Sequence, residues 1–171
     1  DLENPDFIDL SQKKELQDYL IERRKSLGGF LPSRKCSMDS LVPEAASFSE
    51  FNDAVERKQS TTMIFVKLLT KLMRDKGIGK SIVPIVPDEA RTFGMDGLFR
   101  QFGIYSSVGQ KYDPEDSDQV MFYKESKTGI LLEEGINEAG AFSAWLALAT
   151  SYANNNLPMI PFYIYYSMFG F

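Results

Sequence analysis

The chain has 171 residues, a formal net charge of -5 and a hydrophobic content of 43%. This length and composition favour one packed domain, with at most an appendage, and exclude a wholly disordered chain. The acidic balance argues against nucleic acid or an anionic membrane as a partner, because either would require a basic surface. With no histidine and a single cysteine, the chain alone can form neither a disulfide nor a Ser-His nucleophile, and it suits a reducing compartment such as the cytoplasm.

The N-terminal part predicts a short helical segment followed by a linker. Apolar residues at helical spacing indicate a helix within residues 11–29, with Ser11 as its N-cap and two glycines as its end. A connector rich in proline and serine follows, and the domain boundary is expected near residue 40. Residues 1–40 would then be the end of one domain with its linker. Residues 41–171 would be the first part of a second domain, beginning with a short helix at 48–58.

The next segment predicts an amphipathic helix over residues 61–77, in which Ile64, Leu68 and Leu72 face the core. The sequence GIGKS that follows has some features of a phosphate-binding loop. That motif, however, needs a glycine where Arg74 stands and a strand before the loop. We therefore interpret GIGKS as a helix end with a turn.

Short apolar runs predict the strands of a sheet. They lie at residues 81–90, in two extended pieces around a turn at 127–129, and at 157–169. These runs do not alternate with polar residues, a pattern typical of a parallel sheet that is covered on both faces. An almost wholly apolar helix, expected over residues 137–155, should be buried on several sides. The predicted fold class is α/β, a partial parallel sheet with helices on both faces.

Ligands of such sheets bind outside the carboxyl ends of the strands, which marks residues 87–89, 134–138 and 166–169 as neighbours. Glu138 is the most informative of these residues. An acid in the first turn of a helix is commonly explained by the helix dipole alone. If this helix start is buried, the carboxyl favours its neutral form and can donate a hydrogen bond to a ligand nitrogen.

Other candidates have simple structural explanations that remain open. The acids of DPEDSDQ can cap a helix, and those of PDEARTFG can form surface ion pairs. The aromatic residues of PFYIYYSMFGF can be core residues, or they can form a platform on which a flat heterocycle stacks.

Three segments, FLPSRK, VPDEARTFGMDGLFRQFGIYSSVGQKYDPED and ILLEEGINEAGAFSAWLALATSYANNNLPMIPFYIYYSMFGF, closely resemble the bacterial homodimeric-type pyruvate dehydrogenase. This enzyme is the decarboxylating component of the pyruvate dehydrogenase complex. The resemblance runs over essentially all of the chain. Because the family's proteins are several times longer, it implies an internal fragment that contains part of a thiamine diphosphate pyrimidine-binding domain.

The resemblance also implies cofactors, partners and site residues. The cofactors are thiamine diphosphate and Mg²⁺; the partners are pyruvate, a second subunit of a homodimer and a lipoyl-bearing dihydrolipoamide acetyltransferase. Glu138 matches the catalytic glutamate that hydrogen-bonds the pyrimidine nitrogen and promotes loss of the thiazolium proton. Phe169 matches the aromatic residue that packs on the pyrimidine, and Tyr166 lies in the same wall. Glu89 and Asp116 match acids that line the active-site channel.

The family binds diphosphate and magnesium through a Gly-Asp-Gly motif, which this sequence lacks, so no metal ligand is expected here. The family's active-site histidines are missing as well. We therefore expect the isolated fragment to be inactive and to bind thiamine diphosphate weakly or not at all. Its bare apolar surface should lead to oligomerisation, to partial disorder near the C-terminus or to rearrangement there. The alternative is a non-catalytic α/β dimerisation module of a larger transketolase-like protein.

Overall fold

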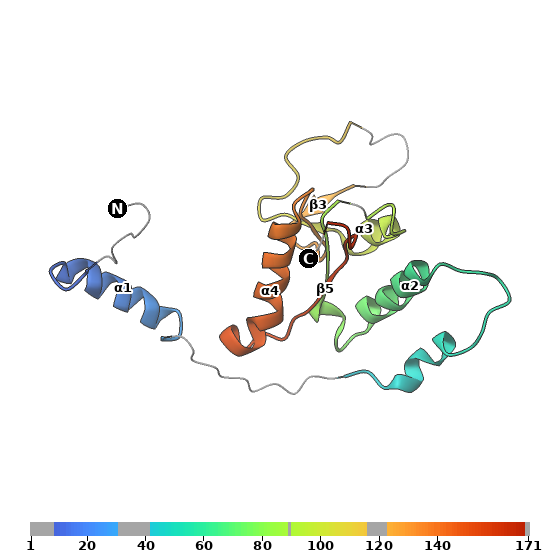
Figure 1. Ribbon diagram of the computed structural model, residues 1–171, viewed down its shortest axis with the longest axis horizontal. Coiled ribbons are helices and arrows are strands. Elements are labelled where there is room, and N and C mark those ends of the chain that lie inside the picture. The colour runs from blue at the N-terminus through green and yellow to red at the C-terminus, as the bar shows by residue number, and fades with distance from the viewer. Residues whose placement is uncertain (1–8, 31–41, 89, 116–122, 170–171) are drawn as a thin grey trace.

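A computed structural model describes residues 9–30, 42–88, 90–115 and 123–169 of the chain (Figure 1). Its centre is a three-stranded parallel sheet in the order β4-β1-β5, formed by β4 Leu132–Glu133, β1 Ile82–Val86 and β5 Ile160–Tyr163. The middle strand β1 aligns Val86 with Glu133 on one side and Ile85 with Tyr163 on the other. The predicted parallel sheet is confirmed, although β5 is shorter than its apolar run and only partly buried.

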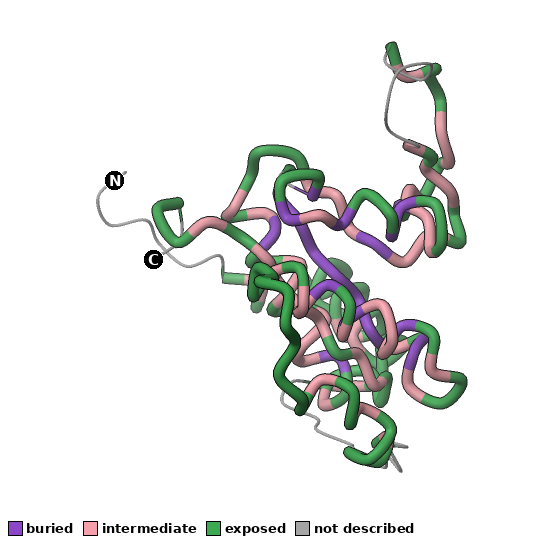
Figure 2. The backbone as a smooth tube through the Cα atoms, turned by 90° about the vertical axis from the view of Figure 1, so that its right-hand side faces the viewer, coloured by how far each residue is buried: buried purple, intermediate pink, exposed green. Residues whose placement is uncertain are grey.

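Helices cover both faces of this sheet, as the sequence predicts. Ile82 and Val86 of β1 pack on the side of α2 Thr61–Arg74 and α3 Asp96–Phe102. Val83 and Ile85 point the other way, toward α4 Glu138–Asn155. Figure 1 shows α4 on one side of β5 and α2 on the other, and Figure 2 shows buried residues gathered in the middle of the domain. Successive strand residues therefore serve two separate cores.

Helix α2 has the predicted amphipathic character, but its buried face differs from the predicted one. The buried residues are Val66, Leu69 and Met73, whereas Ile64, Leu68 and Leu72 are only partly buried. A helix with apolar residues on a wide stripe can turn either half of that stripe to the core. The position of α3 and β1 selects the half that contains Leu69.

The turn predicted at residues 127–129 joins strands of two different sheets. Before the turn, β3 Glu125–Ser126 pairs with β2 Ile104–Tyr105 in a second, two-stranded parallel sheet. After the turn, the chain joins the main sheet as β4. A side chain at Gly129 would collide with the backbone of Ile104, so glycine lets the turn lie directly against β2. Leu131 completes the connection because its carbonyl accepts from the amide of Tyr105 at 2.8 Å.

The N-terminal elements are α1 Lys14–Ser26 and the 3-10 helix η1 Ala45–Phe51; a further 3-10 helix, η2 Gly79–Ser81, follows α2. Ser11 is not the cap of α1, because its hydroxyl and amide both bond Asp9. The GIGKS segment is a turn and η2 before β1, and the amides of Gly77 and Ile78 bond the carboxylate of Asp75. The predicted turn is confirmed, but the helix ends earlier than predicted, at Arg74 with Asp75 as its C-cap. The domain boundary expected near residue 40 lies outside the described residues.

Helix α4 is less buried than its composition predicts. Only Ala141 and Ser151 are buried, whereas Phe142 is 51% exposed and Leu146 is 48% exposed. The expectation of burial on several sides is therefore wrong for this chain: α4 contacts the sheet through one face, and apolar side chains of its other faces lie at the surface. Within the described ranges, no helix has the length and apolar character that crossing a membrane requires.

Candidate active site

The start of α4 is built where the main sheet ends. The amide of Glu134 donates to the carbonyl of Val86 at 3.0 Å, so the chain leaves β4 in contact with β1. Gly135 then adopts a positive φ of 71°, which glycine permits at little cost. Asn137 caps the helix, since its side-chain oxygen accepts from the amide of Gly140 at 3.0 Å. Glu138 is consequently the first residue of α4 and lies at the carboxyl edge of the sheet.

Replacing the cap residue Asn137 by alanine should cost about 1 kcal/mol of stability, because the amide of Gly140 loses its acceptor. Urea unfolding of the intact protein, with hydrogen exchange of the first turn of α4, measures this loss. The matched control is Asn154→Ala, an exposed position near the other end of the same helix. Equal stability of the two variants would contradict the capping role.

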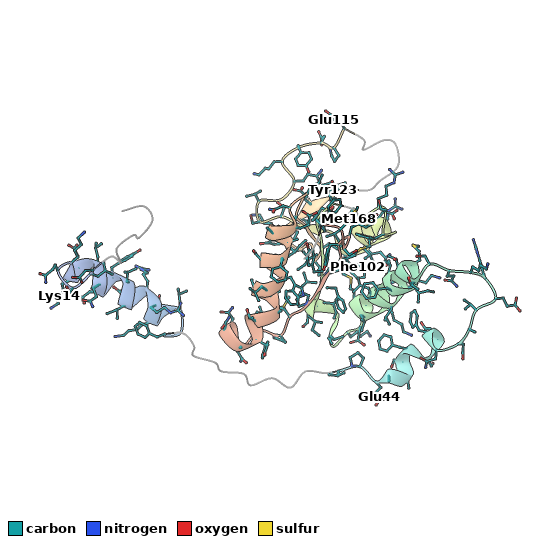
Figure 3. All side chains as sticks on the ribbon, in the orientation of Figure 1. Lys14, Glu44, Phe102, Glu115, Tyr123 and Met168 are labelled. Carbon is teal, nitrogen blue, oxygen red and sulfur yellow. The ribbon has the colours of Figure 1, made fainter. Side chains whose placement is uncertain are left out.

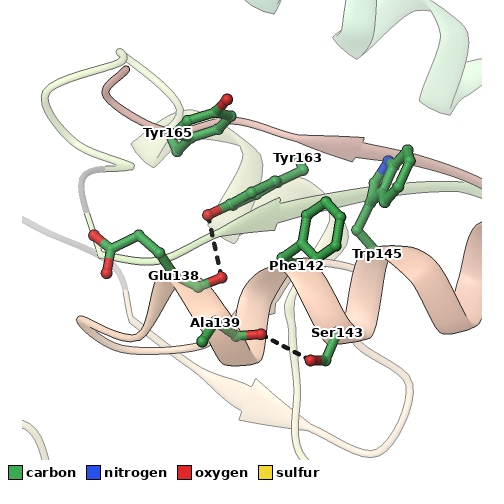
Figure 4. A pocket seen from close by; sticks show the side chains of 7 residues that line it. All are labelled: Glu138, Ala139, Phe142, Ser143, Trp145, Tyr163 and Tyr165. Atoms are coloured by element: carbon green, nitrogen blue, oxygen red, sulfur yellow. Dashed lines mark hydrogen bonds between the residues drawn. The ribbon is translucent and has the colours of Figure 1, made fainter. Parts of the chain in front are cut away.

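A pocket of about 690 Å³ opens beside this helix start. It is lined by Glu138, Ala139, Phe142, Ser143, Trp145, Tyr163 and Tyr165 (Figure 4). Two stacked aromatic pairs form much of its wall. The rings of Phe142 and Trp145 lie 5.4 Å apart, and those of Tyr163 and Tyr165 lie 4.6 Å apart. A pocket with flat aromatic walls and one carboxylate suits a small heterocycle that carries a hydrogen-bonding nitrogen.

Glu138 lies at the edge of this pocket and is half-buried, not interior as the sequence suggests. Its carboxylate extends away from Phe142 and Trp145 (Figure 4). Its backbone carbonyl accepts a hydrogen bond from the Tyr163 hydroxyl at 3.3 Å. The position of the residue is thus defined by strand β5 as well as by its own helix.

The two aromatic residues predicted to bind cofactor lie together, with contacts on the other face of the sheet. Tyr166 packs against Phe93 at 5.1 Å and meets Phe169 edge-to-face at 6.3 Å. Tyr166 also borders the core formed with α2 and α3, and Phe169 is 51% exposed. Both follow the carboxyl end of β5, as expected, but the pocket beside Glu138 is lined by Tyr163 and Tyr165 instead.

The two predicted channel acids, Glu89 and Asp116, lie outside the described residues. Asp88, the neighbour of Glu89, is exposed just beyond β1. Glu115, which precedes Asp116, lies at the far end of a loop and away from α4 (Figure 3). The channel roles of the two acids therefore stay predictions.

Phenol hydrogen bonds attach the loop before Glu115 to strand β3. Tyr112 and Tyr123 both donate to one carboxylate oxygen of Glu125, at 2.9 and 3.1 Å. Burial is the main cause that raises the pKa of the Tyr123 hydroxyl, and its hydrogen bonds to Tyr112 and Glu125 act in the same direction. The phenol therefore stays protonated, and remains a donor, throughout the neutral range.

Comparison with known proteins identifies the family. Residues 42–171 match the pyruvate dehydrogenase E1 component middle domain. The chain belongs to this family. Over its whole length it is 57% identical to the pyruvate dehydrogenase E1 component of Pseudomonas aeruginosa and covers 20% of that protein. The components of Cupriavidus necator and Escherichia coli K12 are 54% and 51% identical over 99% and 100% of the chain. The chain thus spans about a fifth of the length of these relatives.

Membership in the E1 middle-domain family confirms the resemblance seen in the sequence, and the α/β fold with its parallel sheet agrees with it. Sequence reasoning missed Phe142 and Trp145 of the pocket. It offered the segment that contains Tyr163 and Tyr165 as core or as a stacking platform, but it did not single out these two residues. A usable signal was present for the two tyrosines. Successive residues of an extended chain point to opposite faces, so Tyr163 and Tyr165 share a face that Tyr166 does not. The helix residues gave no comparable signal, because α4 is apolar on all sides.

Proposed function

We propose that this E1 middle-domain chain is part of a thiamine diphosphate-dependent pyruvate dehydrogenase that decarboxylates pyruvate and reductively acetylates a lipoyl group. The observation that carries the proposal is the placement of Glu138. It begins α4 at the carboxyl edge of the parallel sheet, beside an aromatic pocket. In sheets of this type, ligands bind at that edge. The names of the relatives, pyruvate dehydrogenase E1 component, support the same reaction.

The residues present suit the pyrimidine half of the cofactor. A flat ring can stack on aromatic walls, and the carboxylate of Glu138 can hydrogen-bond a ring nitrogen. From the family resemblance alone, we also propose that Phe169 and Tyr166 pack on the ring, although the pocket beside Glu138 is lined by Tyr163 and Tyr165. On the same ground we propose that Glu89 and Asp116 line the channel. Diphosphate and Mg²⁺ would be held by residues outside this chain, whose sequence contains no Gly-Asp-Gly motif.

When bound, thiamine diphosphate supplies the nucleophilic carbon and the electron sink of the reaction. The protein contributes position and proton control. Glu138 would hydrogen-bond the pyrimidine nitrogen and hold a proton there, and the bound cofactor would supply the chemistry of proton removal. Proton transfer by a positioned side chain is worth about 10²- to 10⁴-fold in rate. Glu138 is therefore the residue of this chain with the largest catalytic role.

The names of the relatives favour the enzyme over a purely non-catalytic dimerisation module. A homodimer remains part of the proposal, because the exposed Phe142 and Leu146 of α4 form an apolar surface that a partner subunit would cover. The lipoyl-bearing acetyltransferase is proposed from the family alone, as is the cytoplasmic location.

Calorimetry with thiamine diphosphate and Mg²⁺ tests this proposal on two proteins. The full-length protein should bind the cofactor and, with pyruvate, release carbon dioxide and acetylate a lipoyl acceptor. The 171-residue chain should neither bind with micromolar affinity nor turn over, because it supplies only the pyrimidine side of the site. Full-length protein that fails to decarboxylate pyruvate would refute the proposed function. Micromolar binding by the monomeric 171-residue chain would refute the proposal that residues outside this chain are needed to hold the cofactor.

A further inference from the structure

We propose that Tyr163 is a positioning residue for Glu138, holding the first turn of α4 at a fixed place on the sheet. The inference rests on the proposed function of Glu138. It assigns a task to a side chain that touches the helix start directly, yet carries no acid-base chemistry in the reaction.

The direct contact is the hydrogen bond from the Tyr163 hydroxyl to the backbone carbonyl of Glu138, at 3.3 Å (Figure 4). A carbonyl oxygen has two lone pairs, so it can accept from the phenol and also serve its own helix. The bond therefore adds a constraint without disturbing α4. It acts on the backbone of the residue whose side chain must meet the ligand.

Tyr163 itself is held firmly. Tyr163 pairs with Ile85 of the central strand β1, and the amide of the next residue, Ile164, donates to the Ile85 carbonyl at 3.0 Å. Its ring stacks on Tyr165 with a 4.6 Å separation and an angle of 18° between the planes. The ring also packs against the core cluster of Val83, Ile85 and Ala141. The hydroxyl is thus a donor on a rigid support.

The segment that leads into the helix offers little support of its own. Between Glu134, bonded to β1, and Glu138 lie three exposed residues, of which Ile136 is 80% exposed. Asn137 caps the helix but bonds within it, to Gly140. The hydrogen bond from Tyr163 links the start of α4 to β5. Strand β5 pairs with one side of β1, and β4 pairs with the other. Glu138 is consequently located from both neighbours of the central strand.

The test uses the full-length enzyme with the single change Tyr163→Phe, which removes the hydroxyl and keeps the stacked ring. The control, Tyr152→Phe, removes the same group from an exposed residue of α4, the helix that Glu138 begins. The primary measurement is the rate of deuterium exchange at the thiazolium carbon of bound thiamine diphosphate. The exchange is stopped by a quench at set times, at saturating cofactor, and the deuterium content is then measured by NMR. A misplaced Glu138 slows this exchange, whereas a general loss of stability does not change it in protein that remains folded and saturated.

We expect Tyr163→Phe to slow the exchange about 3- to 10-fold, which is the range of one neutral hydrogen bond, and to leave the KM for pyruvate unchanged. Tyr152→Phe should match the wild type. An exchange rate equal in the two variants overturns the inference, even if Tyr163→Phe lowers the thermal unfolding temperature. Glu138→Gln is measured in parallel: if it leaves exchange unchanged, the proposed function of Glu138 is itself wrong, and the inference falls with it.

Discussion

Glutamine in place of Glu138 should lower the rate of pyruvate decarboxylation by the full-length enzyme by about 10²- to 10⁴-fold. Glutamine preserves the size of the side chain and its place in the first turn of α4, but it cannot hold or release the proton. The rate is measured in a single turnover at saturating thiamine diphosphate and Mg²⁺, so that weakened cofactor binding does not contribute.

The control for this experiment is Glu56→Gln, which makes the same chemical change at an exposed acid outside the pocket. It should leave the single-turnover rate within about twofold, as expected for a surface substitution. A loss smaller than about 10-fold in Glu138→Gln would show that the carboxylate is not the proton-handling group. In that case the acid at the helix start would be explained by the dipole alone.

Truncating Phe99 to alanine should destabilise the domain by about 3–5 kcal/mol, the usual cost of removing a buried phenylalanine ring. Phe99 is 2% exposed in α3 and meets Tyr123 edge-to-face at 6.1 Å, so its loss opens a cavity between the main core and the segment that leads into β3. Hydrogen exchange of the β1 amides in the intact protein follows the change, because β1 lies at the centre of the sheet.

Phe30→Ala serves as the control for this core substitution, since Phe30 is 59% exposed. In the Phe30→Ala variant, the amides of β1 should exchange at the same rate as in the wild type. If Phe99→Ala left β1 equally protected, the core on the α2 and α3 face would not contribute to the stability of the sheet in the way its burial implies.

The sequence was most informative where the pattern is local. An uninterrupted apolar run was enough to predict β1, and the run of small apolar residues after Asn137 predicted α4 with nearly its observed bounds. The order β4-β1-β5 was out of reach, because it depends on pairings between segments about 50 to 80 residues apart. The buried face of α2 depends on the same tertiary arrangement, so the prediction chose the wrong half of its apolar stripe.

The candidate site divides in the same manner. Glu138 could be found because strand, glycine, cap and acid follow one another within a few residues. The role of Tyr163 could not, because its partner lies 25 positions away and is reached through the pairing of β5 with β1. The burial of α4 was overestimated, since composition records that a face is apolar but does not say which part of a protein covers it.

The close contact at Gly129 has a consequence for how this family can vary. Position 129 lies against the backbone of Ile104, and a backbone cannot move aside as a flexible side chain can. A substitution there would separate the two sheets that the turn connects. Homologous sequences are therefore expected to keep glycine at this position, even where the exposed residues Lys127 and Thr128 differ freely. Within residues 127–129, sequence variation should therefore stop at position 129, although glycine there has no side chain and no chemical role.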